Sequence, residues 1–135
     1  TKKKVIYLIC DTAEYQKCKP IEKFLNDNGY NVISSKFEGQ PDEIRTEHMR
    51  NLVICDATLI YFGGENENWM KSKLQDLSKS LGFERSKPLG PQAVIIDSEQ
   101  KFDEVLKSRK DTMVLYNKGK FSGDALEPFL EKLEH

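Results

Sequence analysis

The sequence predicts an α/β fold: a three-layer α/β/α sandwich on a five-stranded parallel sheet with strand order 2-1-3-4-5. Short apolar runs of strand length alternate strictly with helical patterns along the chain. Strict alternation favours parallel strands joined by right-handed helical crossovers. Most of the runs are apolar throughout, as expected for strands that are covered on both faces. The 135 residues fit one domain.

The five predicted strands are residues 5–10, 30–35, 57–62, 93–97 and 112–116. The first run is Val5-Ile6-Tyr7-Leu8-Ile9-Cys10, and a continuous apolar run of this length is typical of a central strand. The second run alternates only weakly between apolar and polar residues. Each strand is followed by residues at helical spacing, so five strand–helix pairs are expected.

Apolar residues at helical spacing mark the buried faces of the helices. These are Ile21, Phe24 and Leu25; Ile44, His48, Leu52 and Cys55; Met70, Leu74, Leu77 and Leu81; Phe102, Val105 and Leu106; and Leu126, Phe129 and Leu130. Asp11 and Glu14 have capping-box spacing, which predicts a helix start. Pro20 is expected to kink or divide that helix, and Asn28-Gly29 to end it. Gly82 is expected to close the third helix.

The composition disfavours several classes of protein. A net charge of -1 with 32% charged residues does not describe a nucleic-acid-binding protein. No apolar run approaches the roughly 20 residues that span a bilayer, so no membrane partner is expected and the cytosol is the expected location. Cys10, Cys18 and Cys55 are odd in number and lie in or beside apolar segments, which indicates buried thiols in a reducing compartment.

The chain ends bear on two further expectations. Leu133-Glu134-His135 matches the start of a common expression-tag remnant, so residues 1–132 are predicted to form the domain, within a larger protein. His135 then carries no functional argument, and His48 is left as the single histidine of interest. One histidine disfavours a His-ligated metal or a His-based triad, so no metal site is predicted. His48 is given a structural or solvent role.

Ligands of such sheets bind where the winding direction reverses, between the loops after strands one and three. The candidate residues for a ligand or partner crevice are Asp11, Thr12, Glu38, Gly63, Gly64, Glu65, Glu67, Trp69 and Lys73. No catalytic residue is assigned.

Three known site types do not fit the crevice. A flavin-phosphate loop needs glycines after strand one, and none is there. A phospho-receiver needs an aspartate at the end of strand three, which has Tyr61-Phe62-Gly63 instead. A Walker loop would continue past Gly63-Gly64 to Gly-Lys-Ser, but here acids follow.

Five segments share features with one known type of domain: the strand Val5–Cys10, the helix end Phe24–Tyr30, the loop Glu38–Pro41, the strand Cys55–Phe62 and the helix start Trp69–Leu74. Together they resemble the Toll/interleukin-1 receptor (TIR) type of domain, in particular the TIR-like modules of bacterial multidomain proteins, whose topology is flavodoxin-like. The resemblance covers nearly the whole chain. It implies a signalling or protein-interaction module whose partners are other domains of the parent protein and other TIR-like domains.

One position departs from the resemblance. TIR domains that cleave NAD carry a glutamate four residues after the tryptophan equivalent to Trp69, and this chain has Lys73 there. An ammonium cannot accept a ribose hydroxyl proton, and it disfavours a developing oxocarbenium ion that a carboxylate stabilises. The chain is therefore expected to lack ordinary NAD hydrolysis. No cofactor is predicted, although NAD or another nucleotide is a candidate ligand.

Alternative interpretations stay open. An NAD-processing or nucleotide-sensing domain would need a displaced carboxylate from Glu65, Glu67 or Asp76, and an unrelated flavodoxin-like enzyme is a third hypothesis. The structural interpretation makes Trp69 a partly buried packing residue, Lys73 a solvated side chain whose stem covers Trp69, and Asp11 a helix N-cap. Glu67 and Lys71 are four residues apart, which predicts an ion pair along the helix.

Overall fold

The computed structural model describes residues 3–35, 37–80, 82, 89–97, 106, 109, 111–117 and 119–135. The sheet has five strands in the order β2-β1-β3-β4-β5, and every adjacent pair is parallel. The predicted fold class and strand order are confirmed.

The strands are β1 (Val5–Ile9), β2 (Asn31–Ser34), β3 (Ala57–Phe62), β4 (Gln92–Ile96) and β5 (Thr112–Tyr116). The helices are α1 (Tyr15–Asp27), α2 (Pro41–Ile54), α3 (Glu67–Ser80) and α5 (Glu127–Glu134), with the 3-10 turns η1 (Thr12–Glu14) and η2 (Gly123–Leu126). All five strands match their predicted ranges within one residue at each end, because short apolar runs bounded by polar residues locate them. The predicted helix with Phe102 and Val105 lies outside the described residues, whereas Leu106 is buried.

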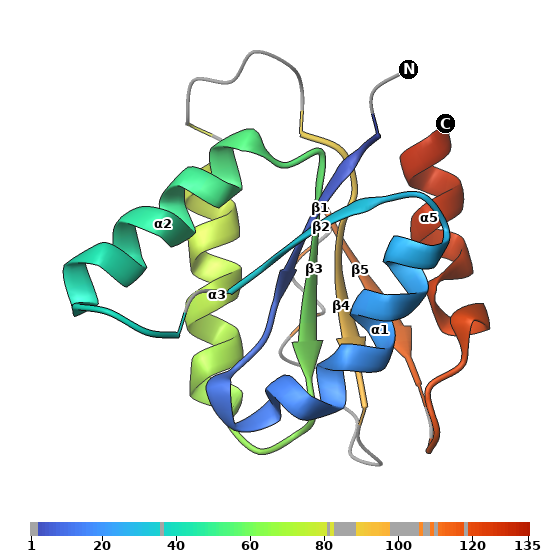
Figure 1. Cartoon of the computed structure of the whole chain (residues 1–135), viewed down its shortest axis with the longest axis horizontal. Coiled ribbons are helices and arrows are strands. Elements are labelled where there is room, and N and C mark those ends of the chain that lie inside the picture. The colour runs from blue at the N-terminus through green and yellow to red at the C-terminus, as the bar shows by residue number, and fades with distance from the viewer. Residues whose placement is uncertain are drawn as a thin grey trace.

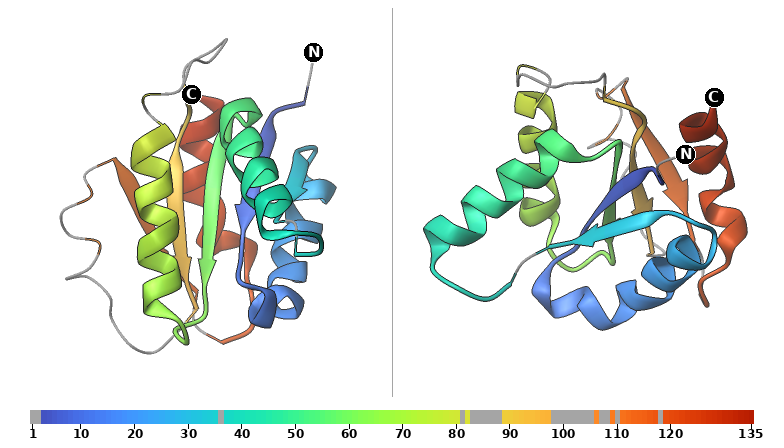
Figure 2. Two further views of the ribbon diagram at one scale, coloured as in Figure 1. Left: turned by 90° about the vertical axis from the view of Figure 1, so that its left-hand side faces the viewer. Right: turned by 45° about the horizontal axis from the view of Figure 1, so that its top comes forward.

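Helices cover both faces of the sheet, as Figures 1 and 2 show. Helices α1 and α5 pack on one face, where their apolar residues meet the alternate strand residues Ile6, Leu8 and Leu59. Helices α2 and α3 pack on the other face against Tyr7 and Ile9 and their neighbours. Successive residues of a strand point to opposite faces. Each strand therefore contributes to two separate cores, and Tyr7 faces α2 and α3.

The start of the first helix differs from its prediction. Asp11 occupies the N-cap position of η1, but its side chain makes no capping hydrogen bond. Glu14 does not reach back to Asp11 in a capping box; it is 1% exposed and lies against Gly63, where an added Cβ would stand 1.6 Å from Glu14 Oε2. The capping-box prediction is wrong because Glu14 is buried against Gly63, at the carboxyl end of the central strand β3.

Pro20 does not divide α1, which runs without interruption from Tyr15 to Asp27. A proline removes one backbone hydrogen bond from a helix. The buried residues Cys18, Ile21 and Leu25 hold the helix on the sheet on both sides of that position. The predicted end at Asn28-Gly29 is confirmed, with Gly29 at φ 91°.

Two further expectations can be compared with the structure. The three cysteines are free and buried, as predicted. Among the helices of the described residues, none has the length and apolarity needed to cross a bilayer. The N-terminus of β1 and the end of α5 lie at the same edge of the sheet (Figure 1), and there the Lys4 Nζ donates to the Leu133 carbonyl at 2.5 Å.

Candidate functional site

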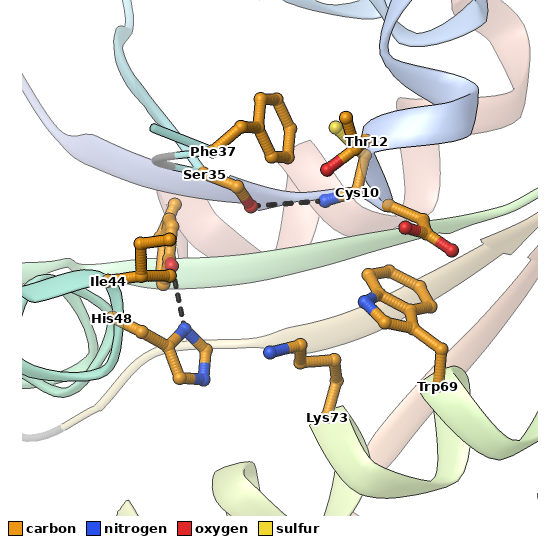
Figure 3. Close-up of a pocket in the computed structure, with 10 residues that line it drawn as sticks. Cys10, Thr12, Ser35, Phe37, Ile44, His48, Trp69 and Lys73 are labelled. Atoms are coloured by element: carbon orange, nitrogen blue, oxygen red, sulfur yellow. Dashed lines mark hydrogen bonds between the residues drawn. The ribbon is translucent and has the colours of Figure 1, made fainter. Parts of the chain in front are cut away.

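A pocket of about 170 Å³ opens at the carboxyl ends of β1 and β2, on the face covered by α2 and α3 (Figure 3). Its lining comes from β1 and the loop after it, the loop after β2, and the two helices. The lining residues are Tyr7, Cys10, Asp11, Thr12, Ser35, Phe37, Ile44, His48, Trp69 and Lys73. The Ser35 Oγ accepts a hydrogen bond from the Cys10 backbone N–H at 3.3 Å, which joins the ends of the two strands.

Four of the predicted crevice residues line this pocket together: Asp11, Thr12, Trp69 and Lys73. The other five, Glu38, Gly63, Gly64, Glu65 and Glu67, are not among its lining residues. Each of the two glycines has a local structural role, because Gly63 makes room for Glu14 and Gly64 adopts a positive φ of 94°. Glu67 pairs with Lys71 at 3.8 Å, which confirms the predicted ion pair.

Asn66 sets the start of α3 and connects it to the loop after β1. Its Oδ1 accepts from the Trp69 backbone N–H at 3.0 Å, the arrangement of a helix N-cap. Its Nδ2 donates to the Asp11 Oδ2 at 3.5 Å. The loops after β1 and β3 are therefore neighbours, as the strand order predicts, and Trp69 stands at the mouth of the pocket.

Lys73 is half-buried, and its amine points into the pocket between His48 and Trp69 (Figure 3). The expectation of a solvated lysine is therefore wrong, whereas Trp69 is partly buried as expected. Burial lowers the pKa of Lys73, and Asp76 and Asp11 partly oppose that shift. Within the described part of the chain, Lys73 forms no ion pair with a carboxylate at contact distance.

A hydrogen-bonded chain forms one wall of the pocket. The Tyr7 hydroxyl lies 2.7 Å from the His48 Nδ1, and the His48 Nε2 lies 3.0 Å from the Asp76 Oδ2. The same Asp76 oxygen accepts from the Arg45 Nη1 at 3.1 Å. A carboxylate only accepts hydrogen bonds, so His48 carries its proton on Nε2, and its Nδ1 accepts the Tyr7 proton.

Burial explains the electrostatics of this chain. His48 is 6% exposed, and burial lowers its pKa to about 4, with the Lys73 cation acting in the same direction. Asp76 opposes the shift without reversing it. Burial also raises the pKa of Tyr7 to about 12. At neutral pH the pocket wall therefore presents a neutral phenol and a neutral imidazole.

Asp76 does not line the pocket, although it was a candidate for the displaced carboxylate. It is 3% exposed and bonded to His48 and Arg45. Asp11 is the carboxylate that does line the pocket. It is partly exposed, and its side chain is not used as a helix cap.

Six lining or supporting residues were not predicted as site residues: Tyr7, Cys10, Ser35, Phe37, Ile44 and His48. One sequence signal pointed to the hydrogen-bonded chain. His48 sits on the apolar face of its helix between Ile44 and Leu52, and Asp76 precedes Leu77 in the next helix. A polar residue at a core position requires a buried partner.

Over the described residues, no group of three or more His, Cys, Asp or Glu side chains is arranged to hold a metal ion. The side chains that line the pocket supply one amine, one rim carboxylate, an imidazole, a thiol, hydroxyl groups and an indole ring.

Comparisons with known proteins give the fold. No family model and no curated protein matches the chain. Among solved structures, the chain is similar to one described as "Structure of Clostridium botulinum CMP N-glycosidase, BcmB", with a TM-score of 0.56 and 12% sequence identity. The match covers 96% of this chain and 99% of that one. A likeness at this level of identity shows a shared α/β fold over the whole chain.

Proposed function

We propose that the chain is a TIR-like signalling module of a larger protein, whose crevice binds a nucleotide without ordinary NAD hydrolysis. The observation that carries the proposal is Lys73, a half-buried amine beside Trp69 at the position where the resemblance calls for a glutamate. An amine can bind an anionic group of a nucleotide, and it cannot stabilise a developing oxocarbenium ion.

The size of the pocket supports binding of one part of a nucleotide at a time. Sites that enclose whole drug-sized ligands measure about 300–1,000 Å³, and this pocket measures about 170 Å³. The indole of Trp69 at its mouth offers a stacking surface for a base, which is worth roughly 1–3 kcal/mol per base. The structural neighbour is described as a CMP N-glycosidase, so a protein with this fold acts on a nucleotide.

The second candidate function is NAD processing with a displaced carboxylate. Asp11 favours it, because this carboxylate lines the same pocket as Trp69 and makes no capping bond. Lys73 disfavours it, because its cation shares that pocket.

The test measures binding and cleavage on the same samples. We expect NAD and nucleoside monophosphates to raise the melting temperature, since ligand at 100 times its Kd stabilises by about 2.7 kcal/mol. Lys73→Met is expected to weaken binding about tenfold or more, as loss of a charge-assisted hydrogen bond costs about 1.5–3 kcal/mol. Lys71→Met is the matched control, because this lysine is exposed on the same helix and pairs with Glu67.

Nicotinamide release is expected to stay at the level of the protein-free control. Release that disappears in Asp11→Asn and persists in Glu65→Gln would contradict the proposal and favour the displaced carboxylate.

The proposal also includes protein interaction in the cytosol, with other domains of the parent protein or other TIR-like domains as partners. Co-purification with the full-length protein tests this part separately.

A further inference from the structure

Among the residues that the structure describes, no carboxylate lies within ion-pair distance of the Lys73 amine. Among the described residues, its closest acidic influences are Asp76 and Asp11. The Asp76 Oδ2 already accepts from His48 and Arg45, and the Asp11 Oδ2 faces Asn66. Burial destabilises the charged form of the amine. An anion bound beside the Lys73 amine would stabilise its charged form and so offset the free-energy cost of burial.

The pocket has the size and the donors for a tetrahedral oxyanion. Its volume of about 170 Å³ corresponds to fewer than about six water molecules at ~30 Å³ each. The Ser35 hydroxyl lines the pocket and accepts from the Cys10 N–H, and its own proton turns from the neighbouring Tyr7 oxygen to a ligand when one binds. The Thr12 hydroxyl is exposed at the same pocket. Sulfate and the dianionic form of a phosphate group are small ligands that only accept hydrogen bonds, which suits such donors.

The Tyr7–His48 hydrogen bond has two possible directions. With neutral His48, Tyr7 donates to Nδ1, and its oxygen offers only lone pairs to the pocket. If Nδ1 gains a proton from solvent, His48 donates to the Tyr7 oxygen, and the phenol proton is released to point at a ligand. The protonated imidazole keeps its Nε2 hydrogen bond to Asp76. One proton is taken up and no covalent bond changes.

We propose that this pocket binds a tetrahedral oxyanion, such as the phosphate of a nucleotide, against Lys73, and that His48 takes up a proton as the anion binds. The inference rests on the proposed function only for the identification of the oxyanion as a nucleotide phosphate. The anion site itself is tested without a nucleotide.

The charges around His48 set the sign of the coupling. Lys73 and Asp76 face it from α3, Arg45 from α2 and Tyr7 from β1. In the free protein, burial, Lys73 and Arg45 oppose protonation. An anion on Lys73 cancels part of that opposition, so the pKa of His48 rises on binding by at least about one unit. Affinity for a non-titrating anion therefore increases as pH falls toward the free value of about 4.

The experiment is an NMR pH titration of the histidine ring protons in sulfate and in chloride at matched ionic strength. Sulfate does not titrate in this range, unlike phosphate, whose second pKa is ≈ 6. The chain has two histidines, so exposed His135 is an internal reference. We expect sulfate to raise the pKa of His48 by at least about one unit.

Two variants make the result specific. Lys73→Met should raise the pKa of His48 in chloride, because a neighbouring cation is lost, and should abolish the sulfate response. Asp11→Asn should enhance the sulfate response, because it removes a repelling carboxylate from the pocket, and Lys71→Met should behave as wild type. A pKa of His48 that is equal in sulfate and chloride, or a response that survives in Lys73→Met, would overturn the inference.

A parallel titration with a nucleoside and its 5′-monophosphate separates the two proposals. A sulfate response without any response to the monophosphate contradicts the proposed function and leaves the anion site standing. Binding of the monophosphate with no change at His48 overturns the anion inference alone.

Discussion

His48 connects three elements of the fold through its two ring nitrogens. One nitrogen meets Tyr7 of β1, the other meets Asp76 of α3, and the ring itself belongs to α2. A buried polar group is tolerated when each of its hydrogen-bonding atoms is satisfied. His48 therefore holds the pocket wall together in its neutral form.

The pH dependence of stability follows from His48. Its pKa is lowered from 6.5 to about 4, so the unfolded chain takes up a proton below pH 6.5 that the folded chain does not take up until about pH 4. This contribution is present above 6.5 and is lost as pH falls toward 4. Between pH 7 and pH 5 it amounts to about 2 kcal/mol. Urea unfolding of wild type and His48→Gln should show that loss in wild type alone.

Tyr7→Phe leaves the His48 Nδ1 buried without a donor. We expect a loss of about 1–3 kcal/mol in the free energy of unfolding. The matched control is Tyr30→Phe, whose hydroxyl donates to Glu134 at an exposed position and should cost under about 0.5 kcal/mol. Equal losses in the two variants would show that the Tyr7–His48 hydrogen bond contributes nothing particular.

At the scale of elements, the junction of β1 and η1 depends on a buried carboxyl group. Glu14 lies against Gly63 at the end of β3, and burial raises the pKa of Glu14 while the Gly63 backbone N–H lowers it in part. A raised pKa means that the folded state favours the protonated acid, and stability from this source is lost as pH rises through the folded pKa.

Glu14→Gln should therefore increase the melting temperature at neutral pH, and the increase should shrink in acid. Glu65→Gln, an exposed change in the loop that faces this junction, is the control and should have little effect. Thermal unfolding monitored by circular dichroism at the two pH values measures both. A lower melting temperature for Glu14→Gln at neutral pH would mean that the carboxylate has a stabilising partner.

The sequence predicts the elements better than their junctions. Apolar runs locate the strands because burial on both faces requires apolar residues at every position. Pro20 and the Asp11–Glu14 spacing mislead because local rules cannot include packing on the sheet. Glu14 lies against a glycine 49 positions away, a contact that no local pattern encodes.

The lack of tertiary information in local patterns also explains which residues of the candidate site the sequence predicts and which it misses. Asp11, Thr12, Trp69 and Lys73 follow from strand order, since the loops after β1 and β3 must be neighbours. The residues that α2 and the loop after β2 contribute to the pocket depend on how α2 is placed against the sheet. Strand order does not determine that placement. Tyr7 lies within an apolar run, where the hydrophobic pattern does not distinguish a tyrosine from a phenylalanine.

At the scale of the molecule, Lys4 and Leu133, near the two ends of the chain, meet at the amino ends of the strands. The pocket lies at the carboxyl ends of the strands, on the opposite side of the molecule. Leu133 is 5% exposed and packs in the core with Leu126 and Phe129, and its carbonyl accepts from Lys4. Leu133 is therefore expected to contribute to stability, and the assignment of residues 133–135 to a tag remnant stays a prediction. The proposed domain of residues 1–132 would lack this contact.

Leu133→Ala should cost about 2–5 kcal/mol, as for a buried leucine. Leu130→Ala, at a half-buried position of the same helix, should cost less. Chemical denaturation of the two variants measures the difference. If Leu133→Ala is harmless, the domain ends before residue 133.

In the whole molecule, the pocket at the carboxyl ends of the strands contains Lys73. Among the described residues, this lysine forms no ion pair with an acid. We propose that Lys73 makes this crevice an anion-binding site. A crystal structure with a nucleoside 5′-monophosphate bound tests this proposal. We expect phosphate oxygens within about 4 Å of the Lys73 Nζ, the limit for an ion pair. A nucleotide whose ribose lies on Asp11 while its phosphate stays in solvent, away from Lys73, would contradict it.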